Sequence, residues 1–327
     1  MNDHRSPAPA PAHPLDMRRN IGVTGLSVGL LLSLCCALGA LAEPTPAPYR
    51  LGFTQGIFSN RNKNDMLAAM KSWSQTITRE RGVDVDPDMI VFDSVEQAVN
   101  AVKGRRVDAL ILLLGEYSAV PAGLLSGPYF RDQVHGKTYV EFVLLGKKDG
   151  AVTELDDLRG ARLIAHADSD VQLALDWLDA RLAESGLGSA SNVASGFERN
   201  PKLSATVLSV FFGKSDACLV TLEGFESMVE LNPQLSRQLS IVEISPPVIP
   251  SLFCFRNDLD EARKTRLFSE ITRLGESVTG QQVLRVFKAD CMAEVTAEEL
   301  DRSLALMNQW KKSVISRSPS TAGTSGN

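Results

Sequence analysis

Residues 94–117, SVEQAVNAVKGRRVDALILLLGEY, decide the fold class. Ser94 is placed to cap a helix that runs to Lys103, with Gln97 at the capping-box position, and Gly104 ends that helix. The run 107–114 is almost continuously apolar, as is typical of a strand at the centre of a parallel sheet. A helix followed directly by a buried strand indicates an α/β fold.

The same alternation continues on both sides of this stretch. Hydrophobic periodicity predicts strands at 49–53, 89–92, 139–145, 162–165, 216–221 and 252–255, and helices at 64–81, 154–158, 170–184 and 203–212, with a helical remainder from 260 to 313. We therefore expect two α/β lobes, each a mainly parallel sheet flanked by helices. The expected organisation is a first lobe at 49–138, a second lobe at 139–251, a return to the first lobe at 252–313, and a disordered tail at 314–327.

Composition excludes several classes of protein. The 327 residues are 44% hydrophobic with a net charge of −5, which excludes a disordered chain. A nucleic-acid binder would show a basic stripe, and this sequence has none. Downstream of residue 42 the histidines are His135 and His166, and the sequence has no H-E-x-x-H, G-x-S-x-G or P-loop motif. We therefore expect neither an enzyme nor a bound cofactor or metal.

The first 42 residues predict export. Arg18 and Arg19 precede an apolar run, and residues 40–42, ALA, place small residues at a signal-peptidase site, so we expect cleavage after Ala42 behind a disordered prefix. Translation starting at Met17 would suit this signal better. The alternatives are an uncleaved anchor, since the run is about 18 residues long, and a lipoprotein, although neither Cys35 nor Cys36 follows a small residue.

Three cysteines remain after cleavage. Cys218 and Cys254 both lie in apolar, strand-like runs, and Cys291 lies in the C-terminal region. Since three is an odd number, at most one disulfide can form. A Cys218–Cys254 bridge and buried free thiols are both open from the sequence.

Four segments, taken in order, carry a family resemblance. They are YRLGF (49–53), the stretch 94–117, YVEFVLLGKKDGAVTELDDLRGARLIA (139–165) and VLSVFFGKSDACLV (207–220). In this order they resemble the substrate-binding proteins of phosphate, phosphite and phosphonate ABC transporters, which have the type II periplasmic binding-protein fold. The resemblance implies two lobes joined by crossing strands at 139–145 and 252–255, a periplasmic monomer that closes over a small ligand, and an inner-membrane ABC permease as partner.

The loop at residues 166–170 departs from the family's pattern. Phosphonate binders have a hydroxyl-rich loop here that holds the anion at a helix N-terminus, whereas this chain has His-Ala-Asp-Ser-Asp. Two carboxylates oppose an anion at that position, and Ser169 or Asp170 could equally serve as a plain N-cap. An amine-bearing or zwitterionic solute would instead suit Asp168, Asp170 and Glu116.

Ligand-binding candidates follow the carboxyl ends of the predicted strands, where α/β sheets place ligands. They are Gln55, Phe58, Glu116, Tyr117, His166, Ser169, Asp170, Lys202, Thr221 and Glu223. Structural roles compete for three of them: an interface tyrosine at Tyr117, a solvated lysine at Lys202 and a helix cap at Glu223. The sequence thus predicts an exported solute-binding protein that delivers a phosphate- or phosphonate-like ligand to a permease. The alternative is a ligand-sensing accessory protein for a membrane signalling partner.

Overall fold

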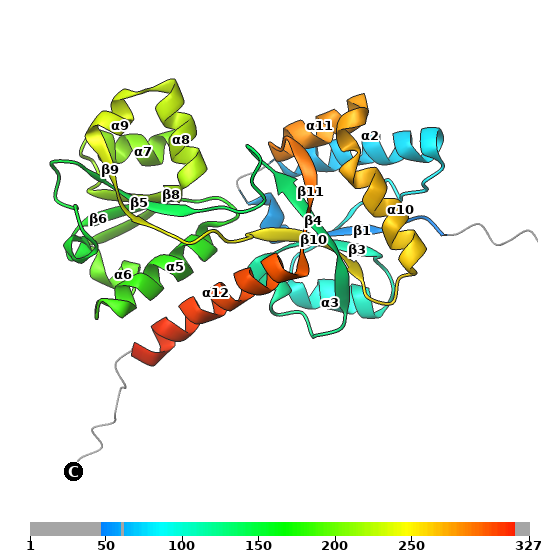
Figure 1. The fold of residues 1–327 in the computed structure, drawn as a ribbon, viewed down its shortest axis with the longest axis horizontal. Helices are drawn as coiled ribbons and strands as arrows, with labels where there is room; N and C mark the ends of the chain where they lie inside the picture. The colour runs from blue at the N-terminus through cyan, green and yellow to red at the C-terminus, as the bar shows by residue number, and fades with distance from the viewer. Residues whose placement is uncertain (1–46, 60–61, 318–327) are drawn as a thin grey trace, which may run out of the picture. The chain divides into compact units, whose positions relative to one another are not determined.

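The computed structural model describes residues 47–59 and 62–317, and the expected signal peptide lies outside them. Two sheets organise this region (Figure 1). The first has the order β11-β4-β10-β3-β1-β2, with β1 (Leu51–Thr54), β2 (Ile90–Phe92), β3 (Ala109–Leu113), β4 (Leu125–Gln133), β10 (Ser251–Arg256) and β11 (Cys291–Val295). The second has the order β7-β6-β8-β5-β9, with β5 (Phe142–Lys147), β6 (Arg162–His166), β7 (Gly196–Asn200), β8 (Ala217–Thr221) and β9 (Leu239–Ile244).

The two-lobe α/β fold expected from the sequence is confirmed, but both sheets are mixed. In the first sheet β1 pairs in parallel with β2 and β3, whereas β10 is antiparallel to β3 and β4, and β11 is antiparallel to β4. In the second, β6 pairs in parallel with β7 and β8, whereas β5 is antiparallel to β8 and β9. The expectation of mainly parallel sheets is therefore wrong, because β5 in the second sheet and β4, β10 and β11 in the first form antiparallel pairs.

Helices follow the strands of both sheets. The first sheet is accompanied by η1 (Gln55–Phe58), α2 (Lys63–Arg81), α3 (Val95–Lys103), α4 (Leu114–Tyr117), α10 (Glu261–Thr272), η3 (Leu274–Glu276) and α11 (Val278–Phe287). The second is accompanied by η2 (Leu155–Leu158), α5 (Val171–Glu184), α6 (Ala190–Val193), α7 (Leu203–Phe211), α8 (Leu222–Leu231) and α9 (Gln234–Gln238). The caps of α3 agree with the sequence: the Ser94 hydroxyl accepts a hydrogen bond from the Gln97 amide at 3.3 Å, and the helix ends at Gly104.

Two connecting segments link the sheets. β5 lies wholly in the second sheet and β10 wholly in the first, so the crossing is made by residues 134–141 and 245–250 rather than by the strands themselves. Val140 and Val248 form an isolated antiparallel bridge between these segments, with N–H to carbonyl distances of 2.9 and 3.0 Å. The strands expected to cross at 139–145 and 252–255 thus lie mostly within the two sheets, and the connections are the bridged segments that precede them.

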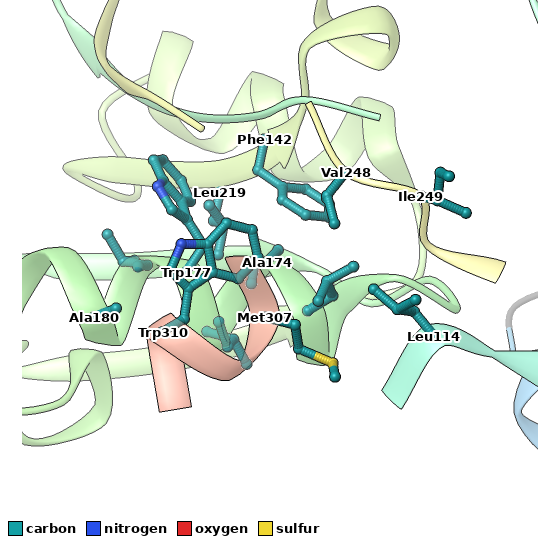
Figure 2. Packing of buried hydrophobic residues seen from close by; sticks show 14 of the residues in the cluster. Leu114, Phe142, Ala174, Trp177, Ala180, Leu219, Val248, Ile249, Met307 and Trp310 are labelled. Carbon is teal, nitrogen blue, oxygen red and sulfur yellow. The ribbon is translucent and has the colours of Figure 1, made fainter. Parts of the chain in front are cut away.

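The C-terminal helix α12 (Ala297–Arg317) packs against α5 beside the second sheet. Figure 2 shows Met307 and Trp310 of α12 beside Ala174 and Trp177 of α5. Both Met307 and Trp310 are buried, as is Trp177. The sequence assigned the whole tail to the first lobe and ended its helices at residue 313; α12 instead contacts the second lobe and continues to Arg317.

Buried apolar side chains form three clusters. One covers the face of the first sheet under α2, α10 and α11, and another covers the face of the second sheet under α7 and α8. The third runs from α3 through α12 to α5 and the opposite face of the second sheet. None of the helices in the described ranges is long and apolar enough to cross a membrane.

All three cysteines downstream of residue 42 are free thiols. Cys218 lies in the second sheet and Cys254 in the first, both fully buried, and burial raises the pKa of each thiol. Cys291 is half-buried, and its thiol lies 3.1 Å from Oε1 of Gln133. Of the two readings left open by the sequence, the structure shows buried free thiols.

Candidate functional site

Glu116 secures the turn between β3 and α4. Its Oε2 accepts hydrogen bonds from the Thr54 hydroxyl at 2.5 Å and from the Leu113 amide at 2.8 Å. The short β1 and β3 strands place Thr54 and Leu113 side by side at the carboxyl edge of the first sheet. The carboxylate is therefore engaged in joining two strand ends, which is a structural task.

The other candidates of the first lobe divide between surface and core. Gln55 is exposed, and its Oε1 accepts a hydrogen bond from Lys63 Nζ at 3.1 Å. Phe58 is buried, with its ring centroid 5.5 Å from that of Phe53, so it packs within the core cluster below α2. Lys63 Nζ also lies 5.8 Å from the centroid of the Phe58 ring, so the two candidates border the same ammonium group.

Tyr117 pairs with a second tyrosine. Its hydroxyl lies 3.3 Å from that of Tyr129 on β4, and the two rings meet edge to face with centroids 6.2 Å apart. Burial raises the pKa of Tyr117, with the hydrogen bond to Tyr129 adding to the effect. Tyr117 therefore remains a neutral hydrogen-bonding group at neutral pH.

The loop after β6 is held together by its own side chains. His166 Nδ1 lies 3.0 Å from Asp168 Oδ2, but the geometry is not that of a hydrogen bond, and Nδ1 is buried without a hydrogen-bond partner among the described residues. Asp168 Oδ1 accepts from the Asp170 amide at 3.1 Å, and the Ser169 hydroxyl donates to Asp170 Oδ1 at 3.0 Å. Asp170 occupies the N-cap position of α5, although its side chain accepts no capping hydrogen bond there.

The remaining candidates lie at helix starts in the second lobe. The Thr221 hydroxyl caps α8 by accepting from the Gly224 amide at 3.2 Å, and Thr221 lines a recess of about 10 Å³ together with His166 and Asp168. Lys202 is exposed at the N-cap of α7. Glu223, in the first turn of α8, has Oε1 3.7 Å from His135 Nδ1.

Glu223 faces charged groups from β4 and the segment that follows it. Burial raises the pKa of its carboxyl group, while the charges of His135 and Arg131 oppose that rise. Asp132 and Lys137 also act on it, with opposite signs. The start of α8 and the end of β4 thus form one electrostatic neighbourhood that spans both lobes.

Arg131 and Asp132 are the residues that sequence reasoning missed. Arg131 is 7% exposed; its Nε donates to the Asp132 carbonyl at 2.9 Å, and its Nη2 lies 3.1 Å from Asp132 Oδ1. Its Nη1 is buried with no hydrogen-bond partner among the described residues. A buried guanidinium N–H without an acceptor is unfavourable, which makes Arg131 a group that an anionic ligand would satisfy.

Arg131, Asp132 and Ser169 contribute to the wall of one cavity. It has a volume of about 60 Å³, and Ser169 is its contribution from the second lobe. The cavity therefore brings the loop after β6 to the end of β4, whereas the other sequence candidates lie outside its wall. Within the described residues, no group of three or more His, Cys, Asp or Glu side chains is arranged to hold a metal ion.

Comparison with known families decides the affiliation. The model of the family described as "ABC transporter, phosphonate, periplasmic substrate-binding protein" matches residues 55–300. The chain belongs to this family. Its members are substrate-binding proteins of transport systems and not a class of enzyme, and the family is periplasmic. A comparison with curated proteins finds no match.

Solved structures with the same fold are distant in sequence. A Xanthomonas citri protein bound to ATP is 15% identical with a TM-score of 0.59, covering 82% of this chain and 100% of its own. A binding protein component of an ABC phosphonate transporter from Pseudomonas aeruginosa is 14% identical with a TM-score of 0.55, covering 84% and 90%. A Prochlorococcus marinus protein in complex with methylphosphonate is 14% identical with a TM-score of 0.53, covering 81% and 98%. These similarities show the fold.

Proposed function

We propose that this chain is an exported solute-binding protein that captures a small phosphate- or phosphonate-like ligand between its two lobes and delivers it to an ABC permease. The single observation that supports the ligand class is the buried Nη1 of Arg131, which lacks an acceptor in a wall shared with Ser169. A phosphorus oxyanion supplies an acceptor for this N–H group, and hydrogen bonds to charged partners are the stronger kind. Family membership supports the permease as partner.

Export supplies the location in this proposal. The basic, apolar and ALA segments of residues 17–42 form a signal peptide, and cleavage after Ala42 releases a monomer to the periplasm. Ligand capture then draws the lobes together about the segments bridged by Val140 and Val248. Closure gives the permease a shape that distinguishes loaded from empty protein.

The other predicted residues have supporting parts in this proposal. Tyr117 offers a neutral hydroxyl from the first lobe, while His166, Ser169 and Asp170 at the start of α5 and Thr221 at the end of β8 contribute from the second. Glu116 and Glu223 shape the local charge, and Lys202, Gln55 and Phe58 complete the set proposed from the sequence. Asp168 and Asp132 add negative charge, which favours a singly charged oxyanion over a doubly charged one.

Thermal shift measurements with inorganic phosphate and methylphosphonate test the ligand class. A ligand at 100 times its dissociation constant stabilises the native state by about 2.7 kcal/mol, which for a chain of this size raises Tm by roughly 5 °C. Arg131→Met should abolish the shift. Arg302→Met removes the same charge from the exposed Arg302 of α12 and should retain it.

Absence of a shift with either anion in the wild-type protein, confirmed by calorimetry, would overturn the ligand class.

Pull-down from membranes tests the partner. Recovery of an ABC permease supports delivery, whereas recovery of a signalling protein without a permease would replace delivery with ligand sensing.

A further inference from the structure

The tight turn that follows β4 reaches from the first lobe toward α8 of the second (Figure 1). Val134 and Lys137 are joined by two N–H to carbonyl hydrogen bonds of 3.0 and 2.9 Å, and His135 and Gly136 form the two-residue turn between them. Both turn residues have positive φ, 48° and 77°, as in a type I′ turn. The turn therefore holds His135 at the tip of a short hairpin.

His135 is an uncommon residue for the first position of this turn. Asparagine, aspartate and glycine are favoured there, and histidine tolerates the conformation without being favoured by it. The backbone at this point is held by the first lobe, because the His135 amide donates to Asp290 Oδ2 at 2.7 Å, just before β11. A non-glycine residue at positive φ is often found where its side chain has a function. The choice of histidine thus needs a reason outside the turn.

The second lobe supplies a partner for this side chain. Glu223 Oε1, in the first turn of α8, lies 3.7 Å from His135 Nδ1. Glu223 is half-buried and the side chain of His135 is 64% exposed, so solvent reaches the contact. His135 lies on the same extension of β4 as Arg131, whose charge also acts on Glu223. The contact therefore joins the two lobes beside the residue that shares a cavity wall with Ser169.

The charges around this contact are mostly negative. The carboxylates are Glu223 and Glu226 of α8, Asp132 of β4, Glu141 of the linker and Asp290, whereas the permanent cations are Arg131 and Lys137. Five carboxylates thus surround the contact with two cations. Histidine is the side chain that ordinarily gains its charge between pH 8 and 5. A positive charge on His135 therefore attracts Glu223 and reduces the excess of negative charge between the lobes.

We infer that His135 is a positioning residue for ligand capture, which in its protonated form draws Glu223 and the second lobe onto the first. Its role in capture rests on the proposed function, whereas the contact between the lobes does not. Since a ligand enclosed between two lobes leaves only when they separate, an interaction that favours the closed form raises the apparent affinity. An ion pair that solvent reaches changes such an equilibrium by about two- to fivefold.

Calorimetric titration with methylphosphonate at about pH 5.5 and about pH 8 tests this role. His135→Asn removes the imidazole and introduces a residue that the turn favours. Comparing this variant with the wild type at each pH cancels the protonation of the ligand itself. We expect His135→Asn to weaken binding by about two- to fivefold at the lower pH and to leave it unchanged at the higher. An equal effect at the two pH values would indicate a purely structural role and overturn the inference.

Two glutamates of α8 test the identity of the partner. In the Glu223→Gln background the effect of His135→Asn at the lower pH should disappear, because the partner charge is gone. Glu230→Gln removes the same charge from an exposed site at the far end of α8 and should retain the effect. Loss of the effect in both backgrounds, or in neither, would overturn the pairing of His135 with Glu223.

Small-angle scattering of the ligand-free protein separates this inference from the proposed function. The wild-type protein should be more compact at the lower pH than at the higher, and this difference should vanish in His135→Asn. The same pH response in both proteins would overturn the inference whether or not a ligand binds. Failure of methylphosphonate and inorganic phosphate to bind would overturn the proposed function and with it the role in capture, and the scattering comparison then decides on the contact between the lobes.

Discussion

Substituting Trp310 by alanine tests whether α12 packs stably against α5 of the second lobe. Trp310 is 4% exposed and lies with Met307 beside Trp177 of α5, as Figure 2 shows. The chain reaches α12 directly from β11, which is paired with β4 in the first sheet. Trp310→Ala therefore removes the largest side chain of α12 from the contact between α12, which follows the first sheet in the chain, and α5 of the second lobe.

The expected loss follows from the area that the indole buries. A buried tryptophan removes about 200 Å² from water, which at about 25 cal/mol per Å² is about 5 kcal/mol. The unfolded chain already buries part of this area, and the alanine retains a methyl group. We therefore expect Trp310→Ala to lower the free energy of unfolding by about 3 to 4 kcal/mol, in line with other aromatic truncations in cores.

Urea unfolding followed by far-UV circular dichroism measures this loss without depending on tryptophan fluorescence. Ile315→Ala is the matched control, because Ile315 lies on the same helix and is 76% exposed. That control should change the free energy of unfolding by less than about 0.5 kcal/mol. A loss below about 1 kcal/mol for Trp310→Ala would show that α12 does not pack on α5 in solution.

Three further changes have definite expected outcomes. Asp108 is buried and accepts from Arg256 Nη2 at 3.0 Å; Asp108→Ala should cost about 3 kcal/mol in urea unfolding, because it leaves a buried guanidinium undercompensated. The hydrogen bonds from Arg162 lower the pKa of Asp216 from 3.8, so the stabilisation is present above pH 3.8 and is lost as the pH falls through the lower native pKa. Asp216→Asn should therefore cost about 1 kcal/mol at pH 7, since Arg162 is half exposed, and an undiminished difference at pH 2 would contradict this cause. Gly146→Ala would press a methyl group against a backbone carbonyl oxygen and should lower Tm by several degrees, equivalent to about 2 kcal/mol; an unchanged Tm would contradict the close approach.

Elements defined by local signals were predictable from the sequence. The capped helix α3 and the buried strand β3 occur where Ser94, Gly104 and the apolar run place them. The strands β4, β7, β9 and β11 were not predicted. The last three lie at sheet edges, where one neighbour suffices and the apolar pattern is weak. β4 is paired on both sides, but its sequence LSGPYFRDQ has no strand-like alternation. Strand direction was also beyond reach, because it depends on pairing partners far away in the chain.

The candidate site divides in the same way. Thr221 and Ser169 follow strand ends, so the rule for ligand positions in α/β sheets nominates them. Arg131 lies within β4, a strand that contains a Gly-Pro pair and three polar or charged residues near its end, so no turn or cap marks it. Its burial comes partly from the pairing of β4 with β11, more than 150 residues later in the chain. The adjacent charges of Arg131 and Asp132 were visible in the sequence, but their burial could be inferred only from the pairing of β4 with β11.

The strand order of the first sheet also dictates the sequence of events during synthesis. β10 lies between β3 and β4, and Cys254 on β10 contacts the Leu110 carbonyl on β3 across 144 residues. The strands of the second sheet, in contrast, occupy one uninterrupted span from β5 to β9. The second lobe can therefore assemble its sheet while β3 still presents an unpaired apolar edge. Until residue 256 has emerged from the ribosome, the first sheet lacks β10 between β3 and β4. It is at this stage that a chaperone would protect the nascent chain from aggregation.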